Sequence, residues 1–179
     1  MDQRKPQPLD AEKLWNYALR ALGGRAHSIG EMREKLGRRA ERAQDVETVL
    51  ARLKESKYLD DRQFAEGYAT ARLSNERFGK TRVLQDLRRR RVAPVLAEKT
   101  VHAVYQNVDE SALIEEWIRR KYRTTPREAL FQEDKDLASA YRRLLRAGFR
   151  TGEIIRVLKK FASNPELLDS FEPPEETEE

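Results

Sequence analysis

Apolar residues recur along this chain in a pattern that repeats three times. Each copy is centred on a leucine, Leu36, Leu87 or Leu144, and these leucines are 51 and then 57 residues apart. One apolar residue precedes each leucine by four positions, and an apolar pair follows it by ten and fourteen positions. The flanking residues are Met32, Val46 and Leu50; Val83, Ala97 and Val101; and Ala140, Ile154 and Leu158. Such self-similarity is typical of repeat proteins, in which each repeat is one small structural unit.

Within each copy the apolar spacing is that of amphipathic α-helices, and we see no alternating pattern typical of a strand. We therefore predict an all-α fold of three tandem three-helix bundles in an extended array, a shape suited to binding along another large molecule. A longer connection at 124–133 accounts for the larger second spacing. The predicted parts are a disordered leader at 1–8, helical repeats at 9–58, 59–107 and 108–164, and an acidic tail at 165–179.

Short local signals mark the expected ends of the helices. Ser28 and Glu31 have the spacing of a capping box, in which each side chain bonds the backbone of the other residue. Asp60 and Asp109 are expected N-caps. Gly148 is expected to end a helix in the left-handed conformation that other residues resist.

Three further expectations concern buried residues and the end of the last helix. We expect Phe64 and Tyr68 to be buried on the helix that follows Asp60, and Val95 to continue the core of the second repeat. Asn164-Pro165 is expected to stop the last helix.

Composition and charge narrow the function. The chain has no cysteine, which excludes disulfides and thiol chemistry. No secretory signal and no apolar run long enough to cross a bilayer are visible, so we expect a cytoplasmic protein without a membrane partner. The last eight residues contain five glutamates and no basic residue, which leaves a net charge of +10 on residues 1–171. A body this basic favours a polyanionic partner, although solvated helix faces rich in arginine remain an alternative.

Groups for catalysis are not brought together by the sequence. The two histidines, His27 and His102, fall in different repeats, and no glycine-rich phosphate loop or zinc-binding spacing is present. Two acidic clusters could suggest a magnesium site, Asp60-Asp61 and Glu133-Asp134 with Asp136. Both stand at expected helix N-termini, where carboxylates offset the helix dipole, and we favour this structural explanation. We therefore predict a binding protein without enzymatic activity, metal or cofactor.

Basic residues are the candidate binding groups. The strongest cluster is the run Arg88 to Arg91 at the end of a helix, which could dock on DNA or on an acidic protein groove. If the repeats stack, one basic group from each could form a discontinuous stripe. The candidate residues are Arg72, Arg77, Lys80, Arg82, Arg88, Arg89, Arg90, Arg91, Arg119, Arg120, Lys121 and Arg123.

One motif resembles that of a known family. Tyr58-Leu59-Asp60-Asp61 with Phe64-Ala65, followed by Phe78-Gly79, is similar to the hallmark of the RecX regulatory proteins of bacteria. The resemblance covers about residues 12–162, and it is looser in Leu144-Leu145-Arg146-Ala147-Gly148-Phe149.

The resemblance implies three three-helix repeats in a curved, elongated molecule, and a monomeric, non-enzymatic modulator of the RecA recombinase. Such proteins lie in the groove of the RecA–DNA filament and suppress its ATP hydrolysis, strand exchange and co-protease activity. They act in DNA repair, the SOS response and the regulation of homologous recombination. Many also bind single- and double-stranded DNA weakly.

We interpret the motif as a structural junction between repeats. Tyr58 and Leu59 are expected to pack this junction, Asp60 to cap the next helix beside Asp61, and Phe64 to be buried. The contacts to the partner are expected on the basic residues instead. The alternative is a freestanding DNA-binding protein, because three-helix bundles resemble helix-turn-helix modules.

Overall fold

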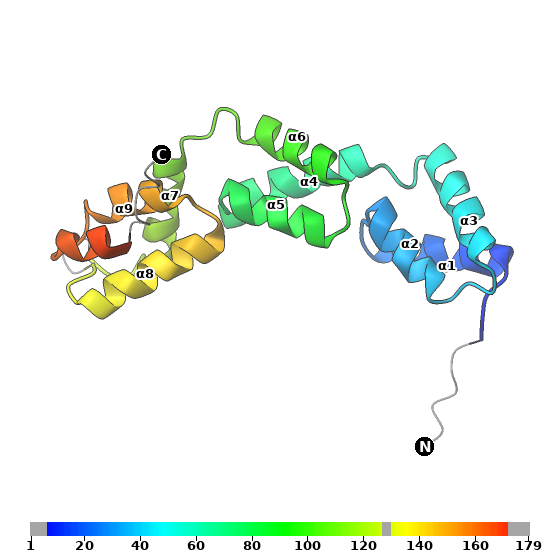
Figure 1. Cartoon of the computed structure of the whole chain (residues 1–179), viewed down its shortest axis with the longest axis horizontal. Coiled ribbons are helices and arrows are strands. Elements are labelled where there is room, and N and C mark those ends of the chain that lie inside the picture. Colours follow the sequence, from blue (N-terminus) through cyan, green and yellow to red (C-terminus); the bar gives the residue numbers. More distant parts are fainter. Residues whose placement is uncertain (1–6, 127–129, 172–179) are drawn as a thin grey trace, which may run out of the picture. The chain divides into compact units, whose positions relative to one another are not determined.

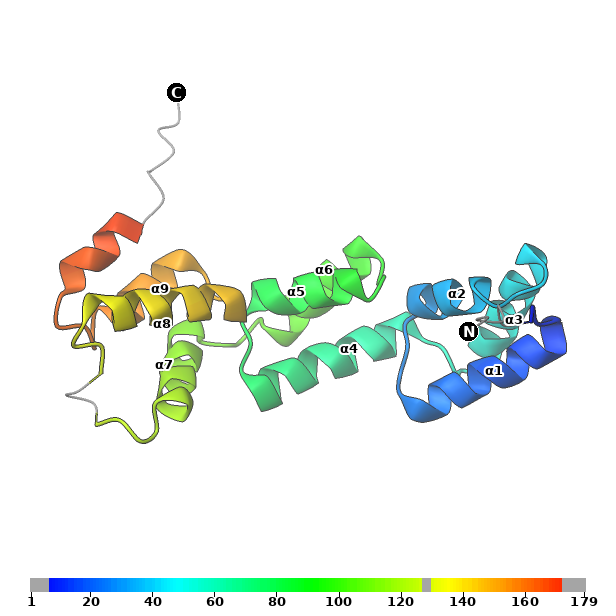
Figure 2. The same ribbon diagram turned by 90° about the horizontal axis from the view of Figure 1, so that it is seen from below.

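The structure, a computed structural model, describes residues 7–126 and 130–171, and these residues form helices joined by short connections (Figures 1 and 2). The helices are α1 (Ala11–Gly24), α2 (Ile29–Gly37), α3 (Ala43–Glu55), α4 (Asp61–Ala71), α5 (Lys80–Arg89), α6 (Pro94–Val104), α7 (Glu110–Lys121), α8 (Asp134–Ala147) and α9 (Thr151–Leu158). A π-helical turn at Arg72–Glu76 extends α4, and a 3-10 helix covers Pro165–Phe171. Within the two described ranges no strand occurs, only an isolated bridge between Leu9 and Ala40, so the all-α prediction is confirmed.

Three sequence predictions fall wholly or partly outside the described residues. These are the leader up to residue 6, the part of the long connection at 127–129, and the glutamate-rich end at 172–179. None of the described helices is both long enough and apolar enough to span a membrane.

The chain divides into two compact units. Unit 1 consists of Met1–Thr70 and Gln85–Val101, and unit 2 consists of Ala71–Leu84 and His102–Glu179. In unit 1, helices α1, α2 and α3, blue to cyan in Figure 1, pack on one another. In unit 2, helix α9 packs on both α7 and α8. Helix α5 contributes its first half to unit 2 and its second half to unit 1.

The threefold pattern in the sequence corresponds to the buried positions of the fold. None of its twelve residues exposes more than 5% of its surface. They are Met32, Leu36, Val46 and Leu50; Val83, Leu87, Ala97 and Val101; and Ala140, Leu144, Ile154 and Leu158. Burial of aliphatic groups is the main favourable contribution to folding, so these positions carry much of the stability of each unit.

The predicted helix ends are confirmed in detail. The Ser28 hydroxyl accepts a hydrogen bond from the Glu31 amide (3.0 Å), and the Glu31 carboxylate accepts one from the Ser28 amide (3.2 Å). Asp60 accepts bonds from two backbone amides of the first turn of α4, and Asp109 does the same for α7. Gly148 follows α8 with φ of +90°. Local sequence therefore sets where these helices begin and end.

Two packing predictions in the second repeat are wrong. Phe64 and Tyr68 are only half-buried, because α4 turns the small residues Ala65 and Ala69 inward instead. Val95 is 78% exposed, since the inward face of α6 is set by Ala97 and Val101 and Val95 lies on the opposite side of the helix.

The last helix, α9, ends at Leu158, before Asn164-Pro165, and a further short helix follows in the segment predicted as an acidic tail. Pro165–Phe171 forms a 3-10 helix in which Leu168 is fully buried. The ring of Phe171 stacks on that of Tyr141, with centroids 4.7 Å apart. The apolar pair at 167–168 therefore adds to the core of unit 2 rather than belonging to a tail.

Candidate binding surfaces

The structure divides the twelve predicted basic residues between the two units. Unit 1 contains Arg88, Arg89, Arg90 and Arg91, and unit 2 contains the other eight: Arg72, Arg77, Lys80, Arg82, Arg119, Arg120, Lys121 and Arg123. Their predicted role in binding stays a prediction. The surroundings of each group, however, show which cations are already paired with carboxylates of the chain.

All four arginines of the run in unit 1 have carboxylate partners. Arg88 pairs with Glu98 (2.7 Å) and Arg89 approaches Asp86 (3.6 Å), and both arginine side chains are well exposed. Arg91 pairs with Glu34 at 2.6 Å. Exposed ion pairs of this kind contribute little stability, so a strong anion could compete for Arg88 and Arg89.

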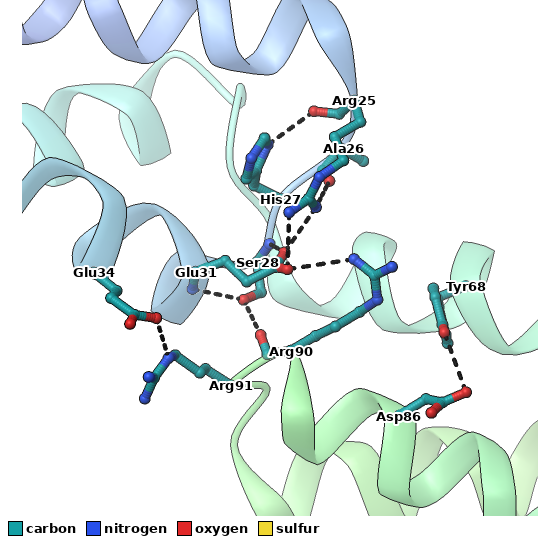
Figure 3. Close-up of polar contacts among 10 residues, drawn as sticks. All are labelled: Arg25, Ala26, His27, Ser28, Glu31, Glu34, Tyr68, Asp86, Arg90 and Arg91. Atoms are coloured by element: carbon teal, nitrogen blue, oxygen red, sulfur yellow. Dashed lines mark hydrogen bonds and ion pairs between the residues drawn. The ribbon is translucent and has the colours of Figure 1, made fainter.

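Arg90 has a different role, because it links the end of α5 to the start of α2 (Figure 3). Its guanidinium lies 3.3 Å from the Glu31 carboxylate and over the ring of Tyr68, 4.7 Å from the centroid. Its carbonyl oxygen accepts a hydrogen bond from the Ser28 hydroxyl. Arg90 is therefore part of the packing of unit 1 rather than a free cation.

Glu31 is the electrostatic centre of this contact. Burial alone would raise its pKa, but hydrogen bonds from Arg25 and from the Ser28 amide, together with the charge of Arg90, hold the pKa below its usual value. The carboxylate is thus ionised at neutral pH and pairs with both arginines. The capping box and the arginine run form one polar network, to which we refer as the α2–α5 junction.

Unit 2 contains a second junction, formed by residues at equivalent positions of the sequence repeat. The Gly79 amide donates to the Ala147 carbonyl (2.8 Å), and the Thr81 amide donates to the Gly148 carbonyl (3.2 Å). Ser28 and Gly79 both stand eight residues before a repeat leucine, and the acceptors Arg90 and Ala147 both stand three residues after the next one. In unit 1 the start of α2 thus meets the end of α5, and in unit 2 the start of α5 meets the end of α8.

His27 lies beside the α2–α5 junction and gives it a pH dependence. The ring is buried, which lowers its pKa, and its Nδ1 donates to the Arg25 carbonyl (2.9 Å). The hydrogen bond to the Arg25 carbonyl and the charge of Glu31 favour the imidazolium, whereas the charges of Arg25 and Lys35 disfavour it, and the net effect on the pKa is a lowering.

We expect unit 1 to lose stability as the pH falls below the ordinary histidine pKa of about 6.5. Below that pH, His27 binds a proton in the unfolded chain but stays neutral in the folded chain, because its pKa is lower there. The free energy of unfolding therefore falls as the pH falls. Urea unfolding between pH 7 and pH 5 should show this slope, and His27→Gln should reduce it. An equal slope in the variant would assign the pH dependence to other groups.

Five of the basic residues in unit 2 are held by the protein itself. Arg72 pairs with Glu76 (2.7 Å), and Arg77 pairs with Glu116 (2.9 Å). Arg82 and Arg120 each donate to a backbone carbonyl, of Arg146 and Asn75 respectively. Lys80 lies 3.5 Å from a ring nitrogen of His102. These contacts position the side chains, although they do not prevent Lys80 and Arg82 from meeting a partner.

Three cations at the end of α7 differ from the rest. Among the residues that the structure describes, no carboxylate pairs with Arg119, Lys121 or Arg123. Arg119 and Arg123 line a hollow of about 580 Å³ whose walls include apolar side chains such as Ile118 and Phe161. We call these three residues the α7 cluster. Of the predicted basic residues, they are the ones best placed to accept an external anion.

The residues of the family motif are partly buried and partly exposed. Leu59 is buried and Asp60 caps α4, which confirms two of the expectations. Asp61 accepts a hydrogen bond from the Ile29 amide (2.7 Å) at the start of α2, and burial raises the pKa of Asp61. Tyr58, by contrast, is 56% exposed, and Phe64 lies beside it in the lining of a second hollow. Sequence reasoning missed this hollow, because its other walls come from α1 and from the turn before α2.

The described ranges contain no group of three or more metal-ligating side chains. His27 and His102 belong to different units, and Asp60 and Asp61 are used in hydrogen bonds to backbone amides. The geometry supports binding chemistry through cations and exposed rings.

Comparison with known proteins gives consistent matches. Family models match the chain in two segments: RecX, first three-helix domain, at residues 15–53, and RecX, second three-helix domain, at residues 60–101. A regulatory protein RecX of Deinococcus radiodurans is 35% identical over 180 residues, which cover 98% of this chain and 79% of the relative. Another from Herminiimonas arsenicoxydans is 31% identical over 74% of this chain and 82% of its own length.

Solved structures agree at the level of the fold. The crystal structure of RecX from Lactobacillus salivarius matches with a TM-score of 0.63 at 17% identity, over 85% of this chain and 96% of its own. A second structure, of a regulatory protein RecX, matches with a TM-score of 0.61 over 84% of this chain and 71% of its own.

Proposed function

Because the chain belongs to the RecX family of regulatory proteins, we propose that it binds in the groove of the RecA–DNA filament and inhibits the activities of the filament. These activities are DNA-dependent ATP hydrolysis, strand exchange and co-protease activity. The protein acts without an enzymatic reaction and as a cytoplasmic monomer. In this role it restrains homologous recombination and the SOS response during DNA repair.

One observation carries this proposal. Almost the whole chain aligns with a RecX protein, and the alignment includes the motif around Tyr58 and both matched three-helix domains. Two features of the molecule support the same function. The described residues bring no catalytic set together, and the chain is basic, with a pI of about 9.5, as suits binding to an assembly built on DNA.

The test is a titration of this protein into RecA filaments formed on single-stranded DNA, with ATP hydrolysis as the readout. Hydrolysis should fall at substoichiometric or near-stoichiometric amounts. Unchanged hydrolysis over a wide range of concentrations would contradict the proposal.

Within this proposal we assign the α7 cluster as a contact to the filament. Changing Arg119, Lys121 and Arg123 together to alanine should raise the half-inhibitory concentration about tenfold, because unpaired cations form charge-assisted bonds to phosphates or carboxylates. The matched control removes three exposed cations that already have partners, Lys13, Arg38 and Lys135. Both variants lose the same charge, so equal effects would point to net charge rather than to a site.

A freestanding DNA-binding protein is the second candidate, favoured by the basic composition and the unpaired α7 cluster. Such a protein would bind DNA in the absence of RecA, with affinity that falls steeply with salt and depends on sequence. Binding of that kind without any effect on RecA would favour this alternative.

A further inference from the structure

The motif residues Tyr58, Asp60 and Phe64 line a hollow of about 300 Å³ on unit 1. The rest of its lining comes from the end of α1, from the turn before α2, and from Gln63, Gly67 and Tyr68 on α4. Most of the surface it offers is therefore aromatic or aliphatic. A site of this kind suits a large apolar side chain.

The aromatic walls are held in place by contacts within unit 1. The rings of Tyr58 and Trp15 form an edge-to-face pair with centroids 6.3 Å apart. The guanidinium of Arg52 lies over the Trp15 ring, 3.9 Å from its centroid. On the other wall, Phe64 stacks against Tyr68 at 6.2 Å. Exposed aromatic residues that are fixed before binding lose little entropy when a partner docks, which is why such residues dominate the energy of many interfaces.

Gly67 provides an independent indication that this space is kept open. It is the seventh of the eleven residues of α4, whereas every other glycine in a helix lies within two residues of a helix end. A glycine inside a helix costs about 1 kcal/mol relative to alanine. No atom outside the helix would lie within 4 Å of a Cβ at Gly67, so the packing of the protein does not require glycine there. Because Gly67 is part of the lining, a side chain at this position would extend from the wall of the hollow into open space.

The charge around the hollow indicates what kind of partner fits. Its lining contains the Asp60 carboxylate and no lysine or arginine. One oxygen of Asp60 bonds two backbone amides, and no hydrogen bond from the described residues reaches the other oxygen. His27 also lines the hollow, and burial lowers its pKa, so its imidazole is neutral at pH 7 and adds no positive charge. The Asp60 carboxylate would attract a lysine or arginine that stands next to an apolar side chain.

We propose that this hollow docks a segment of the RecA protein that presents a large apolar side chain beside a basic residue, the basic residue facing Asp60. The inference rests on the proposed function and gives that function a contact made by protein rather than by DNA. It assigns the motif a binding role in addition to its structural one.

The experiment fills the hollow without disturbing the fold. Gly67→Leu places an aliphatic side chain in the open space, and it should preserve or raise helix stability because leucine favours helices more than glycine does. Gly152→Leu is the matched control, since Gly152 is also helical with no neighbour near its Cβ and lies in unit 2. Tyr58→Ala removes one wall at an exposed position.

Each variant is titrated into RecA filaments on single-stranded DNA, with binding measured by cosedimentation and ATP hydrolysis measured in parallel. Gly67→Leu and Tyr58→Ala should each weaken binding and inhibition at least tenfold, as expected for a central apolar contact. Gly152→Leu should behave as the wild type. Thermal unfolding by circular dichroism should show all three variants folded.

The outcomes separate this inference from the proposed function. If the wild type inhibits and Gly67→Leu and Tyr58→Ala inhibit equally well, the proposed function stands and the docking site is refuted. If Gly67→Leu instead loses binding to free single-stranded DNA, the occupant is a nucleic acid and the inference is also refuted. If the wild type neither binds nor inhibits the filament, the proposed function fails, and the docking site fails with it.

Discussion

Replacing Gly148 with valine is expected to destabilise unit 2 by about 3 kcal/mol or more, from backbone strain and steric overlap together. Gly148 has φ of +90°, which a β-branched residue rarely adopts. A Cβ at this position would also collide with the backbone of Arg82 at the start of α5. The change therefore strains the end of α8 and opens the junction through which the Gly148 carbonyl binds the Thr81 amide.

Trp117 provides the readout, because it packs against the core of unit 2 and the only other tryptophan, Trp15, lies in unit 1. In a Trp15→Phe background, urea unfolding followed by Trp117 fluorescence should show the lower stability of unit 2 in Gly148→Val. Gly152→Val is the control, since that glycine has open space around it and no positive φ. Gly79→Val should resemble Gly148→Val, because its Cβ would meet the Gly148 carbonyl. Similar midpoints for Gly148→Val and Gly152→Val would show that the junction does not hold unit 2 together.

The parts of the fold that sequence predicts well are those fixed by local spacing. The repeat around Leu36, Leu87 and Leu144 is a statement about which residues share a helix face, and every one of its positions is buried. Capping at Ser28 and Asp60 depends on residues within one turn of each other, and both caps form as predicted.

The errors arise where two faces of a helix are both plausible. Helix α4 has two adjacent stripes, an aromatic one at positions 64 and 68 and an alanine one at positions 65 and 69. Hydrophobicity favours the aromatic stripe as the buried one. The fold turns the alanines inward and leaves the rings of Phe64 and Tyr68 half-exposed. Which stripe is buried depends on the helices that pack against α4, and the sequence of α4 alone does not specify that packing.

The candidate surfaces depend even more on contacts between distant residues. The run Arg88 to Arg91 reads as a free basic patch, yet Arg90 and Arg91 meet Glu31 and Glu34, 59 and 57 residues away in the chain. No local pattern indicates these pairings. That no carboxylate of the described residues pairs with the α7 cluster, and that a hollow lies beside Tyr58, likewise become visible only in the tertiary structure.

Arg90→Ala is expected to lower the free energy of unfolding of unit 1 by about 2 kcal/mol, whereas Arg89→Ala should change it by about 0.5 kcal/mol or less. Removal of Arg90 leaves Glu31, which is only 16% exposed, without one of its two cations, and it also removes the cation above the Tyr68 ring. Arg89 approaches Asp86 at 3.6 Å, and its side chain is largely exposed. Trp15 fluorescence in a Trp117→Phe background reports on unit 1, because Trp15 packs against its core.

A double-mutant cycle of Arg90→Ala with Glu31→Gln measures the coupling between the two charges, and it should be clearly favourable if the α2–α5 junction is electrostatic. The same variants decide what the arginine run does on a filament. Loss of inhibition in Arg90→Ala should follow its loss of stability, while Arg88→Ala with Arg89→Ala should keep the fold and report on binding alone. If Arg90→Ala kept the wild-type unfolding midpoint and still failed to inhibit, Arg90 would contact the partner directly. The basic run would then act as a binding surface along its whole length, as its sequence alone suggests.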